Sequence, residues 1–361
     1  MEPIILPRIS NQKPLVTVVS ITYNHETYIR DCLDGFLMQK TSFPIEIIIH
    51  DDASTDHTAD IIREYYEKRP DLFHVIIERE NQYSQHKVIT HPLFLMAQGK
   101  YIALCEGDDY WTDPLKLQKQ SDFMETHPDY SLCCHNAIIW NMKNNNQHPF
   151  YEDYPECDFS IEYILTNRDG LIRTGSMFFR SELVTVLLKY REKCHVGDLP
   201  LAICMAKNGK IHFHKEIMSI YRICSKGSWT EKSTDISHQY YDINSRVKWF
   251  DHIRTLVGCD NAIDTRISRD ILFVNMYEAN YKSFKNRYSL ILYKRLPMFG
   301  RFLFICFYVV IFIYSFIRLP LLFKVSKRLN SKIKEYDRMT QTSFKASQAS
   351  EYPLAIPKYC E

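Results

Sequence analysis

The sequence predicts an α/β fold built on a mostly parallel sheet that is flanked by helices. Three apolar runs rich in β-branched residues, at 15–23, 45–50 and 101–105, have the composition of strands buried on both faces. Segments with helical periodicity separate these runs, and strands that alternate with helices favour parallel pairing. The order of the elements therefore indicates a Rossmann-like mixed sheet in the first half of the chain.

The other elements of this half continue the alternation. They are a strand over 73–78 and helices over 28–38, 58–68, 88–98 and 113–127. Asp113 is expected to cap the last helix, with Pro114 at its first position. Further on, the polar stretch 141–158 indicates a loop or subdomain boundary. Residues 171–222 predict short strands and one helix, and 237–290 is helical and aromatic.

The charge of the chain is divided unevenly, although its net value is only +2. Residues 282–345 carry 14 Lys or Arg and 2 acidic residues, which leaves a net of −10 on the remainder. Such asymmetry points to an anionic partner, either lipid or nucleic acid. The basic segment has an aromatic and apolar interior, so we expect an anionic membrane surface and no nucleic acid.

Residues 302–317 contain no charge and lie between Arg301 and Arg318. This run is shorter than the about 20 apolar residues that a span needs. With basic residues at both ends, a segment that dips into the cytoplasmic leaflet fits best. A buried core helix is the alternative, and a single span is less favoured than either.

Two features favour a cytosolic compartment. The 11 cysteines are scattered without a Cys-x-x-Cys pair, and 1–13 has no basic region followed by an apolar run. We therefore expect a cytoplasmic protein, peripheral or re-entrant at the inner face of the cell membrane.

Three carboxylates, Glu106, Asp108 and Asp109, directly follow the strand at 101–105. Carboxylates this close repel one another unless a cation lies among them, and Mg²⁺ or Mn²⁺ prefers their hard oxygens. Open α/β sheets also bind ligands at strand ends. The alternative is a solvated turn that caps the helix near Asp113.

Two other strands also end in polar residues, Thr22-Tyr23-Asn24 and Asp51-Asp52. In a parallel sheet all three ends emerge at one edge. An aromatic ring and a carboxylate there can stack on a nucleobase and accept a hydrogen bond from it. The alternative for this stretch is helix N-capping, by Ser54 and Asp56.

The three blocks 16–24, 47–56 and 99–111 together resemble family 2 glycosyltransferases, which are inverting enzymes of the GT-A fold. They occur in the family's order and at its usual spacing, and the resemblance covers 14–230. It implies that Tyr23 stacks on a nucleotide base, usually uracil, and that Asp52 hydrogen-bonds this base. Asp51 would share that work, and Thr22 and Asn24 would border the nucleotide.

The acidic block corresponds to the family's Asp-x-Asp motif. The resemblance implies that Asp108 or Asp109 holds Mn²⁺ or Mg²⁺ on the diphosphate. Glu106 would lie near the ribose and Asp108 would also contact the nucleotide. Glu106 in place of the motif's first Asp is a mild departure. The sequence leaves open whether Asp108 or Asp109 is the direct ligand.

The segment Gly197-Asp198-Leu199-Pro200 resembles the one in which this family places its general base, so we expect Asp198 to take the proton from the acceptor hydroxyl. The alternative is an ordinary helix N-cap. In the family segment like 221–229 a His often stands where Cys224 is, so a metal ligand there is in doubt. Arg222 or Lys226 would instead contact the diphosphate.

Two smaller expectations concern the second half. Residues 173–180 predict a strand near the acceptor, with Gly175 allowing close approach. Six histidines have no convincing metal-site spacing, and we expect most to be surface or satisfied core residues: His86, His91, His135, His195, His212 and His214.

The sequence thus predicts a transferase that moves a sugar from a nucleotide sugar, UDP-linked, to a glycan or lipid-linked glycan. A non-catalytic nucleotide-sugar-binding or membrane scaffold is the first alternative. A sugar nucleotidylyltransferase needs a Gly-rich loop after the first strand, and 21–26 has no glycine. The predicted parts are a GT-A domain at 1–235 (nucleotide half 14–112, acceptor half 113–235), a helical extension at 236–300, a membrane-associating segment at 301–335 and a tail at 336–361.

Overall fold

The structure, a computed structural model, describes residues 2–85, 87–167, 171–192, 194, 196–225, 236–267 and 270, with only the backbone at 236–244. Contacts divide the chain into two compact units, Met1–Arg266 and Ile267–Glu361. Nearly all described residues belong to the first unit. The expected segment at 301–335 and the tail lie outside the described residues, and the proposed domain boundaries stay predictions.

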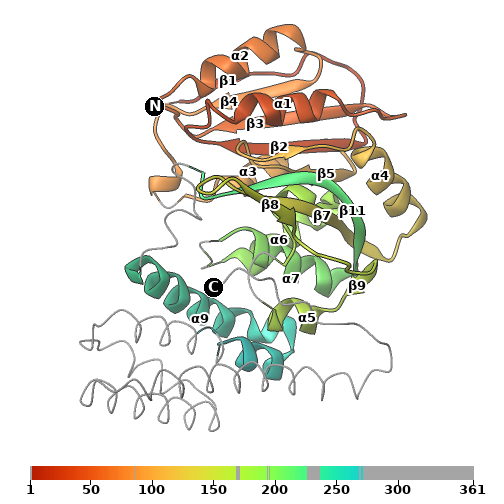
Figure 1. The fold of residues 1–361 in the computed structure, drawn as a ribbon, viewed down its shortest axis with the longest axis vertical. Helices are drawn as coiled ribbons and strands as arrows, with labels where there is room; N and C mark the ends of the chain where they lie inside the picture. Colours follow the sequence, from red (N-terminus) through yellow and green to blue (C-terminus); the bar gives the residue numbers. More distant parts are fainter. Residues whose placement is uncertain are drawn as a thin grey trace. The chain divides into compact units, whose positions relative to one another are not determined.

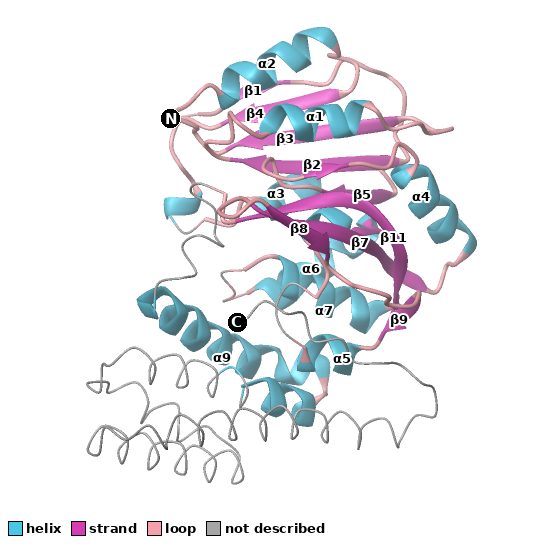
Figure 2. Ribbon diagram, in the orientation of Figure 1, coloured by secondary structure: helices cyan, strands magenta, loops and turns pink. Residues whose placement is uncertain are grey.

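The described part of the first unit is built on an eleven-stranded mixed sheet (Figures 1 and 2). Its main path runs β1-β4-β3-β2-β5-β10-β7-β11-β6, with β8 on β7 and β9 on β11. The strands are β1 (Ile4–Leu6), β2 (Val16–Thr22), β3 (Ile45–Asp51), β4 (Phe73–Ile77), β5 (Tyr101–Leu104), β6 (Tyr110–Trp111), β7 (Tyr130–Asn141), β8 (Asn146–Pro149), β9 (Cys157–Phe159), β10 (Phe178–Arg180) and β11 (Lys210–Ile223).

The centre of the first half is four parallel strands, β4-β3-β2-β5. Antiparallel β10 then joins β5 to β7, and β7 pairs in parallel with the long strand β11. The predicted mixed sheet flanked by helices is therefore confirmed. The β-branched runs form β2 and β3 because strands with helices on both faces must be apolar throughout.

The helices lie on both faces of this sheet (Figures 1 and 2). Neighbouring residues of β10 show the two faces, since Phe178 joins the core cluster beneath α1 while Phe179 contacts Phe94 of α3. The α-helices of the described part with named bounds are α1 (Ile29–Leu37), α2 (Thr58–Lys68), α3 (Thr90–Met96), α4 (Lys116–Thr126), α5 (Ile161–Thr166), α6 (Val184–Arg191), α7 (Asp198–Asn208) and α9 (Ile236–Val257).

One helix shows how spacing produces the core. α1 buries Ile29, Cys32, Leu33 and Phe36, which the 3.6-residue period puts on one face. Phe36 meets the Trp111 ring edge-on, with 4.8 Å between centroids. The chain after the acidic block is thereby fixed against the first helix.

A buried polar network aligns the starts of three central elements. Thr17 donates to Glu46 at 2.6 Å, and the same carboxylate accepts from the Gln98 N–H at 2.7 Å. The Gly99 N–H donates to the Thr17 hydroxyl at 2.9 Å. A Cβ on Gly99 would lie 2.6 Å from the Thr17 nitrogen, so no larger residue fits without displacing the backbone. This glycine therefore lets β5 enter the sheet beside β2.

The structure corrects three element predictions. α4 begins at Lys116, and Asp113 accepts the Leu115 N–H at 2.8 Å, so the turn before it is longer than predicted. The stretch 141–158 is no plain loop, because it contains β8 and β9. Residues 171–222 hold two α-helices and the 14-residue strand β11. The two missed strands are short, with four and three residues, so neither has the apolar run that marks the central strands.

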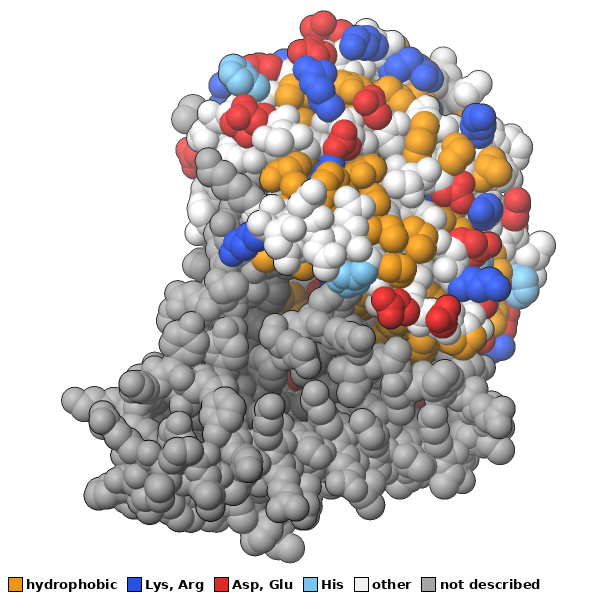
Figure 3. Space-filling model, in the orientation of Figure 1, with side chains coloured by type: hydrophobic (Ala, Val, Ile, Leu, Met, Phe, Trp, Pro, Cys, Tyr) orange, Lys and Arg blue, Asp and Glu red, His pale blue; other side chains and the backbone are white. Residues whose placement is uncertain are grey.

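Within the described ranges, we find no helix that combines the length and apolar character required to cross a bilayer. On the face drawn in Figure 3, acidic and basic side chains of the described part are interspersed with apolar ones.

Lys116 is fully buried at the start of α4. Its amino group donates to Gln120 at 2.7 Å and lies 4.0 Å from the Trp111 ring centroid. Burial lowers the pKa of Lys116 from 10.5 to about 7, against the opposing influence of Cys105 and Cys133. At neutral pH this side chain is therefore close to its titration point in the folded protein.

We predict that stability depends on pH through Lys116. Between pH 7 and 10.5 the unfolded chain keeps a proton that the folded chain lacks, so raising the pH favours the folded state. The unfolding free energy of wild type minus that of Lys116→Met should increase by up to about 1.4 kcal/mol per pH unit in this window. Denaturant titrations at pH 6, 7.5 and 9 measure it, and a constant difference would contradict the prediction.

Candidate active site

The candidate site forms where three parallel strands end side by side. β2 pairs with β3, and Thr22 lies opposite Asp51. The Asp52 N–H donates to the Thr22 carbonyl at 2.9 Å. β5 lies on the other side of β2, and the Gly107 N–H beyond it donates to the Ile21 carbonyl at 2.9 Å. The predicted meeting of three polar strand ends at one edge is confirmed.

The end of β2 combines an open aromatic ring with a fixed turn. Tyr23 is 41% exposed, so one face of its ring is open to a ligand. Asn24 has a φ of 56°, a left-handed conformation that Asn tolerates better than most residues. Its N–H donates to Ser54 at 2.8 Å, and its side chain accepts from the Thr55 N–H at 2.7 Å. Asn24 therefore ties the ends of β2 and β3 together.

The two aspartates after β3 are buried and hold different loops. Asp51 accepts hydrogen bonds from the N–H and hydroxyl of Ser54. Burial raises the pKa of Asp51, although the Ser54 bonds oppose this effect. The two oxygens of Asp52 accept from the N–H groups of Gln82 at 2.7 Å and Tyr83 at 3.0 Å. Asp52 thus orders the loop that follows β4.

The carboxylates of Glu106, Asp108 and Asp109 come together after β5. Each offers one oxygen, and these oxygens lie within 4.8 Å of one another. Solvent reaches Glu106, yet the surrounding protein displaces enough water to raise the pKa of Glu106 to about 8, with further contributions from Asp108 and Asp198. Burial also raises the pKa of Asp109. A cluster of carboxylates whose pKa values are raised favours a bound cation or a bound proton.

The environment of the three carboxylates fits a hard divalent ion. Asp109 is 1% exposed, and its Oδ2 accepts no hydrogen bond from any residue that the structure describes. Asp108 is 9% exposed, and its Oδ2 accepts from the Ser225 hydroxyl at 2.9 Å. Mn²⁺ and Mg²⁺ prefer oxygen ligands of this kind. Ser225 lies two residues beyond the end of β11. Its hydrogen bond to Asp108 connects this strand to residues 106–109, which we call the acidic loop.

Arg222 joins the last long strand to the acidic loop. Its Nη1 donates to the Asp108 carbonyl at 2.7 Å, and its backbone N–H donates to Asp109 at 2.7 Å. Its Nη2 forms an ion pair with Asp31 of α1. Three rings surround the guanidinium at 4.6–5.4 Å, from Tyr28, Tyr110 and Trp140. This buried group is engaged with protein, and its contact with a diphosphate stays a prediction.

Asp198 is the first residue of α7 and lies on the side of the acidic loop. Its Oδ1 accepts from the Leu199 N–H at 2.8 Å, and its charge contributes to the raised pKa of Glu106. Arg191, at the end of α6, is close enough that the charge of Asp198 acts on it. Burial lowers the pKa of Arg191, and Cys194 and Asp198 oppose that shift. Asp198 therefore combines a position at the N-terminus of α7 with a nearby cation.

Three further sequence expectations concern Lys226, the strand at 173–180 and Gly175. Lys226 lies outside the described residues, so its role stays a prediction. The strand expected over 173–180 is confined to Phe178–Arg180, and 174–176 forms a single 3₁₀ turn. A Cβ on Gly175 would meet only the Cys105 sulfur, at an ordinary 3.7 Å, and the close approach of an acceptor there stays a prediction.

Sequence reasoning missed His25 and Arg191. His25 is buried beside the acidic loop, and its Nδ1 has no hydrogen-bond partner among the described residues. Burial lowers the pKa of His25, while the charge of Asp108 opposes this shift. The sequence could have indicated His25, because this residue directly follows Asn24 at the polar end of β2. Arg191 gave none, because its proximity to Asp198 depends on how α6 packs on α7.

Comparison with known proteins identifies the family. Residues 17–185 match the model of glycosyl transferase family 2. An uncharacterised glycosyltransferase of Nostoc sp. is 30% identical, over 62% of this chain and 69% of its own length. The chain belongs to glycosyltransferase family 2.

Other relatives of this family 2 chain match a smaller share of their length. An uncharacterised protein of Mycobacterium tuberculosis is 38% identical over 61% of this chain, and the match spans 62% of that protein. The Escherichia coli enzyme WfaP, named a UDP-Glc:α-D-GlcNAc-diphosphoundecaprenol β-1,3-glucosyltransferase, is 38% identical over 31% of this chain and 42% of its own. S. aureus TarS 1–349, solved with UDP-GlcNAc, shares the fold with a TM-score of 0.59 and 16% identity, over 79% of this chain and 82% of TarS.

We predict that Gly107→Ala disrupts the acidic loop. A Cβ there would lie 2.7 Å from the Thr22 hydroxyl and 3.0 Å from His25 Nδ1, so the loop or the end of β2 must move. Mn²⁺ affinity, measured by calorimetry in the presence of UDP, should fall about tenfold or more, since a shift of the carboxylates weakens ion binding.

Gly175→Ala is the matched control, because its Cβ meets only one sulfur at van der Waals distance. It should bind Mn²⁺ like wild type. If both variants or neither lost affinity, the close packing at Gly107 would not be the cause.

Proposed function

We propose that this chain is an inverting glycosyltransferase of the GT-A type that transfers a sugar from a UDP-sugar to the hydroxyl of a glycan or lipid-linked glycan. The observation that carries the proposal is the position of Asp198. Its charge acts on Glu106, one of three carboxylates grouped at the strand edge expected to bind the nucleotide. A site of this kind has both a place for the diphosphate and a separate base.

The nucleotide is assigned to the ends of β2 and β3. Tyr23 offers an open ring for stacking, and Asp52 offers carboxylate oxygens with lone pairs left after two backbone hydrogen bonds. Thr22, Asn24 and Asp51 hold these two groups in place. The complex of TarS with UDP-GlcNAc supports a UDP-linked donor for a chain of this fold.

The acidic loop is assigned to a divalent ion, Mn²⁺ or Mg²⁺. Glu106, Asp108 and Asp109 are the proposed ligands, because one oxygen of each lies within 4.8 Å of the others and Asp109 Oδ2 accepts no hydrogen bond from a described residue. The ion would offset the charge that develops on the departing diphosphate. Glu106 is exposed to solvent, so its carboxylate is accessible to an ion at this position.

Asp198 is assigned as the general base. It would take the proton of the acceptor hydroxyl while the hydroxyl oxygen forms a bond to the anomeric carbon. The bond from that carbon to the diphosphate oxygen breaks at the same time, and the nucleoside diphosphate leaves from the opposite face. Attack on the opposite face inverts the anomeric configuration.

The acceptor is assigned by analogy with the relatives. WfaP is named for a diphosphoundecaprenol acceptor, which supports a lipid-linked glycan and a role in making surface polysaccharide. The basic, apolar segment at 301–335 would bring the enzyme to the inner face of the membrane, where such a lipid is found. The cytoplasmic location rests on the same sequence features.

We predict that Asp198→Asn lowers kcat by about 10²–10⁴-fold, because the amide cannot accept the hydroxyl proton. Affinity for the donor should change little, because the proposed nucleotide site lies at the ends of β2 and β3 and Asp198 is on α7. The measurement is release of nucleoside diphosphate from a panel of nucleotide sugars with Mn²⁺ or Mg²⁺ and a lipid-linked acceptor.

Asp60→Asn provides the control for this experiment. Asp60 is a largely exposed carboxylate on α2 that pairs with Arg63. Its variant should turn over like wild type. If Asp198→Asn were as fast as wild type, the base assignment would be wrong. If wild type bound donors but transferred no sugar to any acceptor, the scaffold alternative would gain support.

We predict that removing the chain after residue 290 abolishes binding to anionic membranes. The full chain should float with vesicles that contain phosphatidylglycerol, and should bind less as salt screens the basic residues. Vesicles of phosphatidylcholine alone are the control. A shortened chain that floated equally well would contradict the proposed membrane segment.

A further inference from the structure

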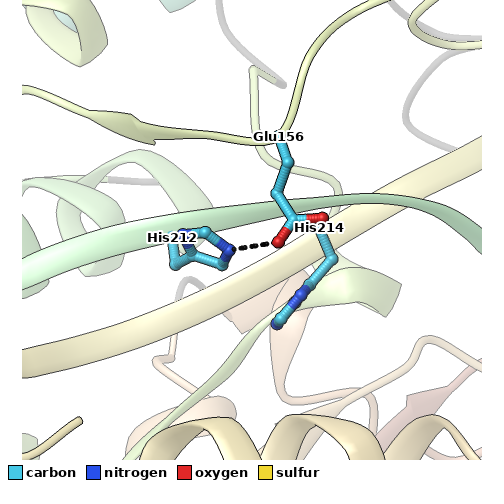
Figure 4. A group of neighbouring side chains, drawn as sticks. All are labelled: Glu156, His212 and His214. Carbon is cyan, nitrogen blue, oxygen red and sulfur yellow. Dashed lines mark hydrogen bonds and ion pairs between the residues drawn. The ribbon is translucent and has the colours of Figure 1, made fainter.

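We propose that Glu156, His212 and His214 form a second metal site, suited to Zn²⁺ and separate from the acidic loop (Figure 4). Each side chain offers one ligand atom, and these atoms lie within 4.8 Å of one another. The site is distinct because His212 and Arg222 are ten residues apart on one strand, which corresponds to roughly 30 Å.

The pairing of β9 with β11 creates this group. The strands are antiparallel, with His212 opposite Asp158 and Phe213 opposite Cys157. Residues directly opposite in a ladder point to the same face, and alternate residues along a strand do likewise. Glu156, one residue before β9, therefore joins the two histidines on one face. Cys157 and Phe213 point to the other face, where both are buried.

His212 is held in the orientation that a metal ligand needs. Its Nδ1 lies 2.9 Å from Asp158, whose other oxygen accepts from the Tyr130 hydroxyl at 2.7 Å. A carboxylate on the second ring nitrogen is the usual partner of a metal-bound histidine. Nε2 then faces a Glu156 oxygen at 3.1 Å. With Nδ1 protonated, two acceptors face one another there, so a cation or a second proton belongs between them.

His214 supplies the observation that separates this group from an ordinary ion pair. It is 9% exposed, and its Nε2 is buried without a hydrogen-bond partner among the described residues. Nε2 of His214 therefore offers a ligand atom that no described protein group occupies. Lys119 is nearby but forms an ion pair with Asp113 at 2.7 Å.

A ring of α4 makes the two histidines rigid. Phe123 stacks on His212 with 4.3 Å between centroids and meets His214 edge-on at 5.1 Å. His127 stacks on the opposite face of Phe123 at 4.3 Å. Ligands fixed in this way lose little conformational entropy when an ion binds.

The donor set selects the class of ion. Two imidazole nitrogens and one carboxylate suit Zn²⁺ and similar transition metals, whereas Mg²⁺ and Ca²⁺ require oxygen ligands. Water would complete the tetrahedron on the side of Glu156, which is exposed. A bound ion would link β9 to β11 across the chain between 156 and 212, so it should stabilise the folded state.

The test is zinc binding by the full chain, expressed without a polyhistidine tag and stripped of metal. Zn²⁺ is titrated in competition with a chromophoric chelator, and thermal unfolding is followed with and without the ion. Wild type should bind one Zn²⁺ tightly and unfold at a higher temperature when it is present. His214→Ala and Glu156→Gln should weaken binding by at least about tenfold and lose the thermal shift.

Two further variants make the result specific. His127→Gln removes an exposed histidine of the same aromatic stack and should bind Zn²⁺ like wild type. Asp108→Asn alters the acidic loop and should also keep this Zn²⁺. Because Glu156 is largely exposed, its variant should fold even if His214→Ala does not. Absence of tight Zn²⁺ binding by wild type, equal binding by Glu156→Gln, or loss in Asp108→Asn would each overturn the proposal.

Discussion

The ion pair and hydrogen bonds of Arg222 connect the two halves of the described domain at the candidate site. A single side chain on β11 reaches the carbonyl of the acidic loop and a carboxylate on α1, and its own N–H fixes Asp109. Because Arg222 is almost fully buried, its charge is offset by nearby partners rather than by water. The position of the acidic loop therefore depends on a strand that lies more than 100 residues further along the chain.

This dependence separates what the sequence could predict from what it could not. β2, β3 and β5 were predictable because a strand buried on both faces leaves a continuous apolar run, and parallel strands bring their ends to one edge. The place of Tyr23, Asp52 and the acidic loop at that edge followed from the same pattern.

The second half was harder to predict because its contacts are distant in sequence. β8 and β9 have only four and three residues, so they resemble loops until β7 and β11 pair with them. The pairing of β9 with β11 also determines the surroundings of His212 and His214. Their His-x-His spacing alone did not indicate a metal site. Only the register of β9 against β11 brings Glu156 and Asp158 to them. The inward position of Arg222 likewise depends on strand pairing, whereas the proximity of Arg191 to Asp198 follows from the packing of α6 on α7.

The two backbone hydrogen bonds that Asp52 accepts from Gln82 and Tyr83 have a consequence for how this site is studied. The carboxylate expected to select the nucleobase is also the one that holds the loop after β4. Base selectivity and loop order are therefore not independent properties. An altered preference among nucleotides in an Asp52 variant would report on a rearranged loop as well as on a lost contact. Changes of nucleotide specificity in this family 2 chain are better sought at Tyr23, because no loop contact of its side chain is described.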